Sequence, residues 1–365
     1  MKETQERGRI TIIGLGLIGG SLGLAIKAAG LPGVEIVGHA RRREVASKAR
    51  KMGAIDRAEH NLPRAVEQAR MVIIATPVLA VREVMQQIAP DLPEGCVVTD
   101  VSSTKERVME WAAEILPPSV SFVGGHPMAG KEKQGIENAE AGLFRGCAYC
   151  VCPAVDAHES AVRAVIGVVR LVGAEPLFLD PKEHDQYAAA VSHLPLLVST
   201  ALFSLLRASP AWNDLAPMAS SGFRDLTRLA SGDPRMSHDI FLTNRDAAIH
   251  WLDRMVEELR RYRDLLDGDA EKLMETFATA QADRDTFLVE PRPRRAEEER
   301  PDVRQELMNS LMGGWIADRL KRARDLPGLM REPGQTPDDG GPSRAERVAE
   351  DIRRDLEGRE QKGGG

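Results

Sequence analysis

Apolar residues along the first half of the chain form short runs that alternate with stretches of helical periodicity. The runs lack regular polar positions, which is typical of strands buried on both faces of a parallel sheet. The predicted strands are 9–13, 34–38, 71–75, 97–100, 120–123, 149–152 and 175–179. The first predicted helix ends at Ala29, and the later ones are 44–52, 81–88, 105–116 and 160–172. This alternation predicts an α/β domain with a doubly wound parallel sheet.

The pattern changes after Asp180-Pro181. No strand is predicted from 183 to 266, and the helical stretches there include 185–206 and 239–266. Because these helices are long and apolar, the sequence favours their burial between two subunits. We therefore expect an all-helical second domain that forms a homodimer.

The composition changes again beyond Glu290. Residues 291–301 are rich in Arg, Glu and Pro and are typical of a linker. An apolar stripe at helical spacing then predicts an amphipathic docking helix, formed by Val303, Leu307, Leu311, Trp315 and Leu320. The residues from 331 onward are rich in Gly, Pro and charge and are expected to be disordered. The four expected segments are 1–180, 181–290, 291–330 and 331–365.

A glycine-rich turn joins the first predicted strand to the first helix. It reads Gly14-Leu15-Gly16-Leu17-Ile18-Gly19. Gly14 suits the tight turn, Gly16 leaves room for a pyrophosphate, and Gly19 lets the helix approach the strand. The free amides and the positive dipole end of the helix would face the phosphates. In this context the turn predicts a Rossmann-type domain that binds NAD or NADP.

The end of the second predicted strand bears on the choice of cofactor. NAD-type sites usually place an acid there, but this chain reads Gly38-His39-Ala40-Arg41-Arg42-Arg43. The guanidinium groups of Arg41 and Arg42 suit a 2′-phosphate, which favours NADP and leaves dual use open. The alternative is that these arginines are simply solvated at the start of a helix.

Three loops follow the carboxyl ends of predicted strands, where parallel sheets bind their ligands. They are Thr76-Pro77, 100–105 and 124–130. His126 lies in the last of them, between Gly-Gly and Pro-Met-Ala-Gly. A neutral imidazole accepts a proton near neutral pH, and flanking glycines allow a ligand to approach the backbone. The alternative is a histidine that only shapes a turn.

The hydroxyls of Ser102, Ser103 and Thr104 precede a predicted helix. Such residues cap helix N-termini, and for two of the three we expect only that role. In the second domain, Ser192-His193-Leu194-Pro195 places a proline within a helical run. The proline interrupts the hydrogen-bond ladder and leaves His193 available to a ligand, unless the histidine is packed in a kinked helix.

Composition narrows the classes of partner. The net charge of −6 and the pI near 5.9 argue against nucleic-acid binding. No apolar run approaches the roughly 20 residues of a membrane span, and residues 1–9 are polar, so we expect a cytoplasmic protein without a membrane partner. The four cysteines suit a reducing compartment, and because 148–152 is typical of a buried strand, no metal site is expected.

Seven short motifs occur in a fixed order between about residue 9 and about residue 287. They are GLGLIGGS (14–21), ATP (75–77), DVSSTK (100–105), GGHPMAGKE (124–132), EHD (183–185), SHLP (192–195) and GFRDLTR (222–228). Together they resemble the prephenate/arogenate dehydrogenase family of tyrosine biosynthesis. The resemblance implies a Rossmann domain followed by a helical dimerisation domain. It also implies NAD(P)-linked oxidative decarboxylation of a small cyclohexadienol to a phenol.

The resemblance also implies roles for individual residues. His126 matches the family's catalytic histidine and would accept the proton of the ring hydroxyl. Ser103 matches an active-site serine and would hydrogen-bond the same hydroxyl. Arg228 would hold a substrate carboxylate with its guanidinium fork, and His193 would contact the substrate's side-chain end.

The resemblance covers two acidic residues, and the chain differs from the family at two other positions. Glu132 and Asp225 resemble gating or supporting acids near the substrate. The chain has Ser237 where the family commonly has a tryptophan, and Leu196 where a second polar residue is frequent. The regulatory module that some members append is not recognisable, so feedback inhibition through such a module is not expected.

Two other functions stay open from the sequence. One is a related NAD(P)-dependent reductase of β-hydroxyacids or imines, but such enzymes usually use a lysine in the helical domain, where this chain offers His193. The other is a non-catalytic NAD(P)-sensing module that signals through the stripe at 303–320. A sensing module would have little need of His126 and Arg228 together. The choice between prephenate and arogenate stays open as well, because one or two contacts can decide it.

Overall fold

The computed structural model describes residues 8–131 and 133–289, all within the first of the two units, 1–317 and 318–365, into which the chain divides. The predicted linker, docking helix and tail beyond 290 lie outside the described residues. We call the described residues up to 180 the sheet domain and residues 181–289 the helical domain.

An eight-stranded sheet forms the centre of the sheet domain, in the order β3-β2-β1-β4-β5-β6-β7-β8. The strands are β1 (Gly8–Ile13), β2 (Val34–His39), β3 (Arg57–Ala58), β4 (Met71–Ile74), β5 (Val97–Asp100), β6 (Ser121–Pro127), β7 (Ala148–Pro153) and β8 (Glu175–Phe178). All neighbouring strands are parallel except β6 and β7. The doubly wound fold is therefore confirmed, with one antiparallel pair that the sequence did not predict.

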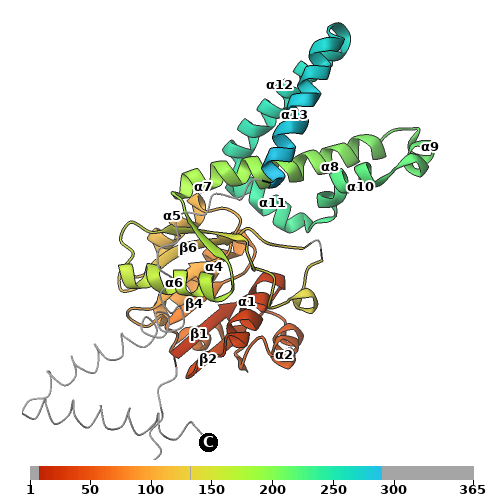
Figure 1. Cartoon of the computed structure of the whole chain (residues 1–365). Helices are drawn as coiled ribbons and strands as arrows, with labels where there is room; N and C mark the ends of the chain where they lie inside the picture. The colour runs from red at the N-terminus through yellow and green to blue at the C-terminus, as the bar shows by residue number, and fades with distance from the viewer. Residues whose placement is uncertain (1–7, 132, 290–365) are drawn as a thin grey trace, which may run out of the picture. The chain divides into compact units, whose positions relative to one another are not determined.

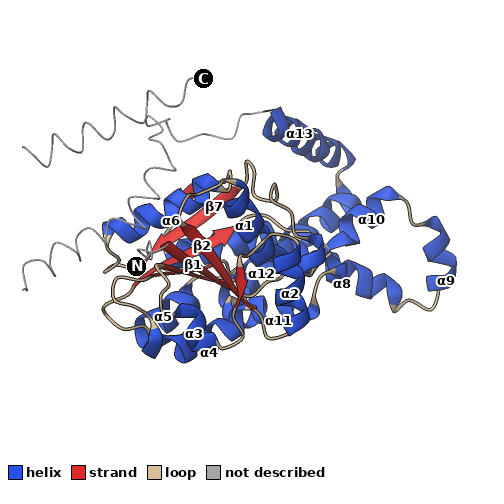
Figure 2. Cartoon of the chain, turned by 90° about the horizontal axis from the view of Figure 1, so that it is seen from below, coloured by secondary structure: helices blue, strands red, loops and turns tan. Residues whose placement is uncertain are grey.

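Helices cover both faces of the sheet, as Figure 2 shows. They are α1 (Leu17–Ala28), α2 (Arg43–Lys51), α3 (Leu62–Val66), α4 (Val78–Ile88), α5 (Glu106–Ile115) and α6 (Glu159–Leu171). Successive residues of β1 pack into different cores, because Ile12 packs with α1, α2 and α6 while Ile13 packs with α3, α4 and α5. Burial of both faces explains why these strands are apolar without alternation.

Among residues 181–289 the regular elements are all helical. They are α7 (Pro181–Ala188), a π-turn (Ala189–His193), α8 (Leu194–Arg207), α9 (Trp212–Leu215), α10 (Ser221–Thr227), α11 (Pro234–Thr243), α12 (Arg245–Gly268) and α13 (Ala270–Val289). Helices α12 and α13 form an antiparallel hairpin (Figure 1). The all-helical prediction is confirmed, and α13 extends it.

A single long helix runs from Pro181 to Arg207 through the π-turn. Among the described residues it alone is long and apolar enough to cross a membrane by length and composition. The expectation that no apolar run approaches that length was therefore wrong, since Ser192, His193 and Pro195 interrupt the run in the sequence without ending the helix. Pro195 sits near the start of α8, where its missing amide costs little because the π-turn already shifts the backbone hydrogen bonds.

Candidate active site

The glycine turn after β1 is shaped as the sequence predicted. Gly14 has φ +99°, and a Cβ there would lie 2.3 Å from the carbonyl oxygen of Ala75. A Cβ at Gly19 would lie 1.9 Å from the carbonyl oxygen of Gly14. A Cβ at Gly16, in contrast, would meet no atom within 4 Å. Two glycines are thus needed for packing, whereas the third faces open space.

That space suits the pyrophosphate of a dinucleotide. Gly16 is the N-cap of α1 and offers no side chain to the first amides of the helix. The turn lies between β1 and β4, where the strand order reverses and α/β sheets bind their ligands. Thr76 lies against the turn, and its hydroxyl is buried without a hydrogen-bond partner, next to Pro77 at the start of α4. The residues present therefore fit NAD or NADP.

Replacing Gly16 with alanine separates cofactor binding from folding. Its φ of −88° is open to any residue, so the melting temperature is expected to change little. The added methyl group occupies the phosphate space, and the dissociation constant for NAD(P) is expected to rise about tenfold or more. Fluorescence titration and thermal melting measure the two effects.

Gly14→Ala is the matched control for that variant. The left-handed backbone and the close carbonyl of Ala75 are expected to lower its stability by about 1–3 kcal/mol. An unchanged cofactor affinity in Gly16→Ala would move the pyrophosphate away from this turn.

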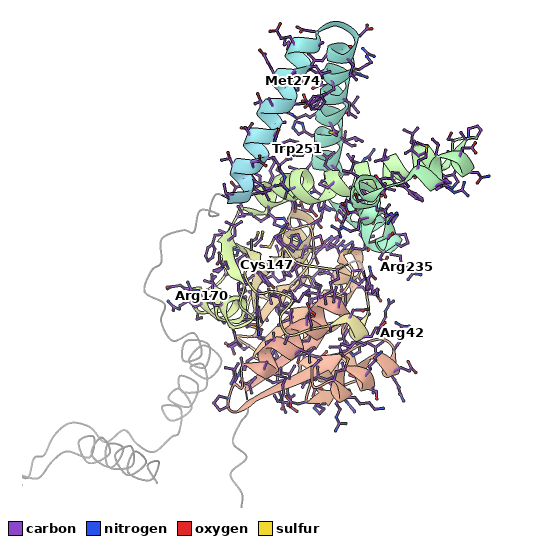
Figure 3. The ribbon with its side chains drawn as sticks, turned by 45° about the vertical axis from the view of Figure 1, so that its right-hand side comes forward. Arg42, Cys147, Arg170, Arg235, Trp251 and Met274 are labelled. Carbon is purple, nitrogen blue, oxygen red and sulfur yellow. The ribbon has the colours of Figure 1, made fainter. Side chains whose placement is uncertain are left out.

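The arginines after β2 are exposed. Arg42 is the N-cap of α2 and lies at the surface of the sheet domain (Figure 3). Lys48 of α2 forms an ion pair with Glu137 at 3.5 Å. A hydrogen bond from its own backbone amide is the main cause that lowers the pKa of the Glu137 carboxyl group, and the charges of Lys48 and Arg42 lower it further. This part of the surface therefore contains both signs of charge.

His126 lies on β6, and the prediction of a loop at 124–130 was wrong for its first half. β6 continues to Pro127 because it pairs with β7, with His126 opposite Cys150. Packing within the protein also requires the two glycines before His126. A Cβ at Gly125 would lie 2.5 Å from the carbonyl oxygen of Asp100, and one at Gly124 would lie 2.9 Å from the Met109 sulfur. They allow close packing of β6 against its neighbours.

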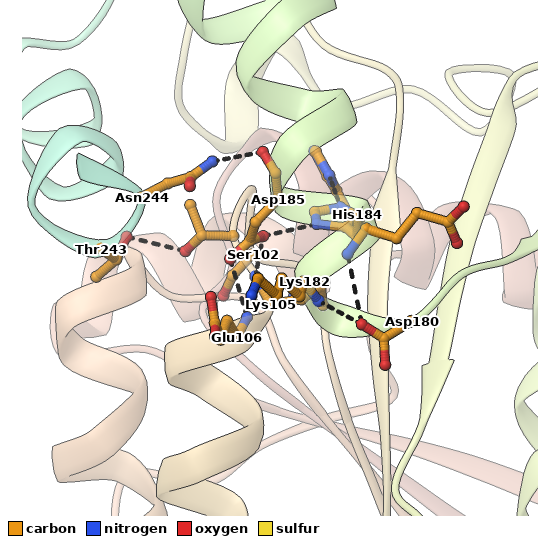
Figure 4. A network of polar contacts seen from close by, with 12 residues as sticks. Ser102, Lys105, Glu106, Asp180, Lys182, His184, Asp185, Thr243 and Asn244 are labelled. Atoms are coloured by element: carbon orange, nitrogen blue, oxygen red, sulfur yellow. Dashed lines mark hydrogen bonds and ion pairs between the residues drawn. The ribbon is translucent and has the colours of Figure 1, made fainter. Parts of the chain in front are cut away.

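The imidazole of His126 is the first member of a buried hydrogen-bonded chain. Its Nδ1 lies 2.9 Å from Nε2 of His184, and Nδ1 of His184 lies 2.8 Å from Oδ1 of Asp185. His126 belongs to the sheet domain, whereas the other two residues lie on α7 of the helical domain. Figure 4 shows His184 and Asp185 within this network.

Asp185 also caps α5. Its Oδ1 accepts a hydrogen bond from the Lys105 amide at 2.7 Å, and its Oδ2 accepts one from the Glu106 amide at 3.0 Å. The expectation that serines or threonine before this helix cap it was therefore wrong, since the cap comes from another domain. Thr104 instead bonds Thr243 of α11 at 2.9 Å between hydroxyl oxygens (Figure 4).

A buried ion pair lies beside this chain. Nζ of Lys105 is 2.5 Å from Oδ2 of Asp100, and neither side chain is accessible to solvent. Asp100 also accepts hydrogen bonds from the amides of Gly125 and Ser102 at 3.0 and 2.9 Å. Since the Asp100 carboxylate is held by the cation and two amides, it fixes the start of the β5–α5 loop.

Burial and charge hold the histidines neutral near pH 7. Burial is the main cause that lowers the pKa of His126 well below its ordinary value, and the neighbouring His184, Lys105 and His193 lower it further. The pKa of His184 is lowered as well, again chiefly by burial, although the Asp185 carboxylate opposes the shift. A neutral imidazole is the form in which His126 can accept a proton.

His193 lies at the end of the π-turn and is fully buried. Burial lowers its pKa to about 4, and the Asp185 carboxylate opposes that shift. Its Nδ1 lies 3.3 Å from the side-chain nitrogen Nδ2 of Asn244, while its Nε2 is buried and makes no hydrogen bond. A buried ring nitrogen without a partner indicates a position for a polar ligand group.

The remaining predicted residues lie in different surroundings. Ser103 is half-buried in the β5–α5 loop, and Arg228 is exposed directly after α10. Asp225 is exposed on α10, and within 8–131 and 133–289 no hydrogen bond or ion pair joins it to His126 or its partners. Glu132 lies outside the described residues. In the same ranges no cluster of three metal-ligating side chains occurs.

The sequence predicted no role for Lys105, His184 and Asp185, which belong to the motifs DVSSTK and EHD, nor for Asn244, which lies in none of the seven motifs. Those motifs were the available signal, but which atoms meet depends on the packing of the two domains.

Sequence comparisons match both domains of the chain to one family. The sequence model described as prephenate dehydrogenase, nucleotide-binding domain, matches residues 22–177, and the one described as prephenate dehydrogenase, dimerization domain, matches 180–279. The prephenate dehydrogenase of Bacillus subtilis is 36% identical over 287 residues, which are 77% of this chain and 76% of that protein.

Solved structures extend the likeness. A prephenate dehydrogenase from A. aeolicus, in complex with hydroxyphenyl propionate and NAD+, has a TM-score of 0.72 and 30% identity, covering 78% of this chain and all of that one. Synechocystis arogenate dehydrogenase has a TM-score of 0.66 and 28% identity, covering 76% and 99%. The two matched domains, the glycine turn and the buried histidine chain occur together, and the chain belongs to the prephenate dehydrogenase family.

Proposed function

We propose that this chain catalyses the NAD(P)-linked oxidative decarboxylation of prephenate or arogenate, giving 4-hydroxyphenylpyruvate or tyrosine. The observation that carries the proposal is a buried, neutral His126 beside the binding edge of a dinucleotide domain in a chain of this family. Such a site suits an alcohol oxidation that leads to an aromatic ring, and the reaction belongs to tyrosine biosynthesis.

The chain's own groups then have defined tasks. The bound cofactor supplies the oxidant that takes a hydride from the hydroxyl-bearing ring carbon. His126 accepts the hydroxyl proton, so that a carbonyl group forms and loss of carbon dioxide makes the ring aromatic. Because the site is buried, water is kept from competing for the same proton.

Five further residues are proposed to position the substrate. We place Ser103 at the reacting hydroxyl and Arg228 at a carboxylate, which its planar fork can bind through two hydrogen bonds. The unpartnered Nε2 of His193 supports a contact with the substrate's side chain. Glu132 and Asp225 are proposed as acids that help to order the entrance to the site.

The second domain is proposed to form a homodimer in the cytoplasm. Its helices expose apolar side chains such as Val191, Leu205, Val256 and Met274, the last labelled in Figure 3. Contact with a second subunit through this surface would also account for the apolar character of Pro181–Arg207. That helix carries the buried His184 and Asp185, which supports packing against protein and argues against a membrane role.

A two-by-two assay tests the function: prephenate and arogenate, each with NAD and with NADP. Turnover is expected with at least one substrate, and the exposed Arg41 and Arg42, without an acid in that turn, favour use of NADP alone or of both cofactors. Absorbance of the reduced nicotinamide measures the rate, with Arg41→Ala/Arg42→Ala as the cofactor control.

Each other result has a consequence. Binding of NAD(P) without turnover of either substrate would favour the sensing module. Turnover of a β-hydroxyacid or imine alone would favour the related reductases. If the double arginine variant prefers NADP over NAD to the same extent as the wild-type chain, these arginines do not determine which cofactor is used.

A further inference from the structure

We infer that His184 and Asp185 are positioning residues that keep a proton on Nδ1 of His126 and leave Nε2 as the atom that accepts the substrate's proton. The inference rests on the proposed role of His126 as the base. It adds which nitrogen acts, and which residues select that nitrogen.

The argument starts at the carboxylate. Both oxygens of Asp185 accept hydrogen bonds from backbone amides, those of Lys105 and Glu106. A carboxylate in that position can only accept, so the contact at 2.8 Å requires Nδ1 of His184 to carry the hydrogen. The tautomer of His184 is thereby fixed.

The second step passes to His126. A neutral His184 with its hydrogen on Nδ1 has an unprotonated Nε2, which can only accept. Since that atom lies 2.9 Å from Nδ1 of His126, the hydrogen between the two rings belongs to His126. Its Nε2 is then the unprotonated nitrogen, and within 8–131 and 133–289 it makes no hydrogen bond.

The surroundings keep His184 in the required state. The charged or titratable groups that face it are Lys105 and Asp100 from the sheet domain, Asp185 from its own helix, and the rings of His126 and His193. Asp100 is bound to Lys105, so the cation is partly balanced. Burial then disfavours a proton on Nε2 of His184, which would reverse the tautomer of His126.

The orientation of the pair is also fixed. The carbonyl oxygen of Asp185 accepts a hydrogen bond from the side-chain amide of Asn244 at 2.7 Å, and its carboxylate is held at the N-terminus of α5. The two rings meet nearly edge-to-face, with their planes 64° apart. The arrangement leaves His126 little freedom to turn Nδ1 toward the substrate.

Nitrogen NMR of the full chain tests the inference directly. In protein labelled with 15N-histidine at pH 7.5, with His126→Asn used for assignment, His126 is expected to show a protonated Nδ1 and an unprotonated Nε2. This measurement needs no substrate, so it stands even if prephenate and arogenate are not turned over. A signal from a protonated Nε2 of His126 in the wild-type chain would overturn the inference.

A pair of variants tests the consequence. His184→Phe fills similar volume but offers no acceptor, so the His126 signal is expected to show a mixture of tautomers and kcat/KM to fall about tenfold or more. In His184→Gln an amide oxygen can accept from His126, and activity is expected to recover in part. The NAD(P) dissociation constant should stay within about twofold in both.

Thr243→Val is the matched control. It removes a buried hydrogen bond between the same two domains without touching His184, and the His126 tautomer is expected to stay unchanged. If His184→Phe keeps both the wild-type tautomer and the wild-type kcat/KM, the positioning role is wrong. If His184→Phe does not fold, the wild-type spectrum and His184→Gln still decide the question.

Discussion

His126→Asn is expected to lower kcat by a factor on the order of 10² to 10⁴ while NAD(P) affinity stays near the wild-type value. Asparagine is polar and similar in reach to part of the imidazole, but it cannot take up a proton. The backbone of β6 should be retained because its pairing with β7 does not use the side chain. Steady-state rates and a cofactor titration measure the two quantities, and near-normal turnover would reject the role of base.

The pH profile of the wild-type chain gives an independent check on His126. Burial and neighbouring positive charge lower the pKa of this imidazole, so its neutral form is expected to persist below pH 6.5. kcat/KM should therefore stay level as the pH falls through 6.5 and decline only at lower pH. In His126→Asn that decline is expected to disappear. A wild-type decline centred above 6.5 would contradict the role of burial.

Arg228→Ala is expected to raise KM for the ring substrate about 10²-fold, equivalent to ~2.7 kcal/mol, because a paired guanidinium fork is lost. The KM for the cofactor should change far less. Arg228→Lys is the matched control: it keeps the charge but not the two parallel donors, so an intermediate KM is expected.

Arg228 is exposed, so its replacement should have little effect on folding, and thermal melting checks this. An unchanged KM in Arg228→Ala would assign the substrate carboxylate to another residue.

Local patterns predicted much of the sheet domain. The turn at 14–19 needs a left-handed residue, close approach of a helix and open space for a phosphate. Three glycines close together in the sequence are enough to indicate all of these. The strands could be predicted because burial on both faces of the sheet leaves unbroken apolar runs in the local sequence. The family's order of motifs supplied the choice of His126 as the base.

Contacts between distant segments were not predictable in the same way. The extension of β6 through His126 depends on pairing with β7, and the cap on α5 comes from a residue 80 positions later in the chain. His126 and His184 are 58 positions apart, so no local pattern joins them. Helix α13 escaped prediction because its apolar residues do not gather on one face.

The cap on α5 has a consequence for the movement of the two domains. If the helical domain moved away from the sheet domain, Asp185 would leave the amides of Lys105 and Glu106 without their acceptor, and His126 would lose the partner of its Nδ1. Opening the interface would therefore uncap a helix and, if His126 is the base as proposed, release its tautomer in one step. The proposed proton transfer is thus expected to be most efficient when the two domains are closed, because the proposed base and the residues that position it belong to different domains.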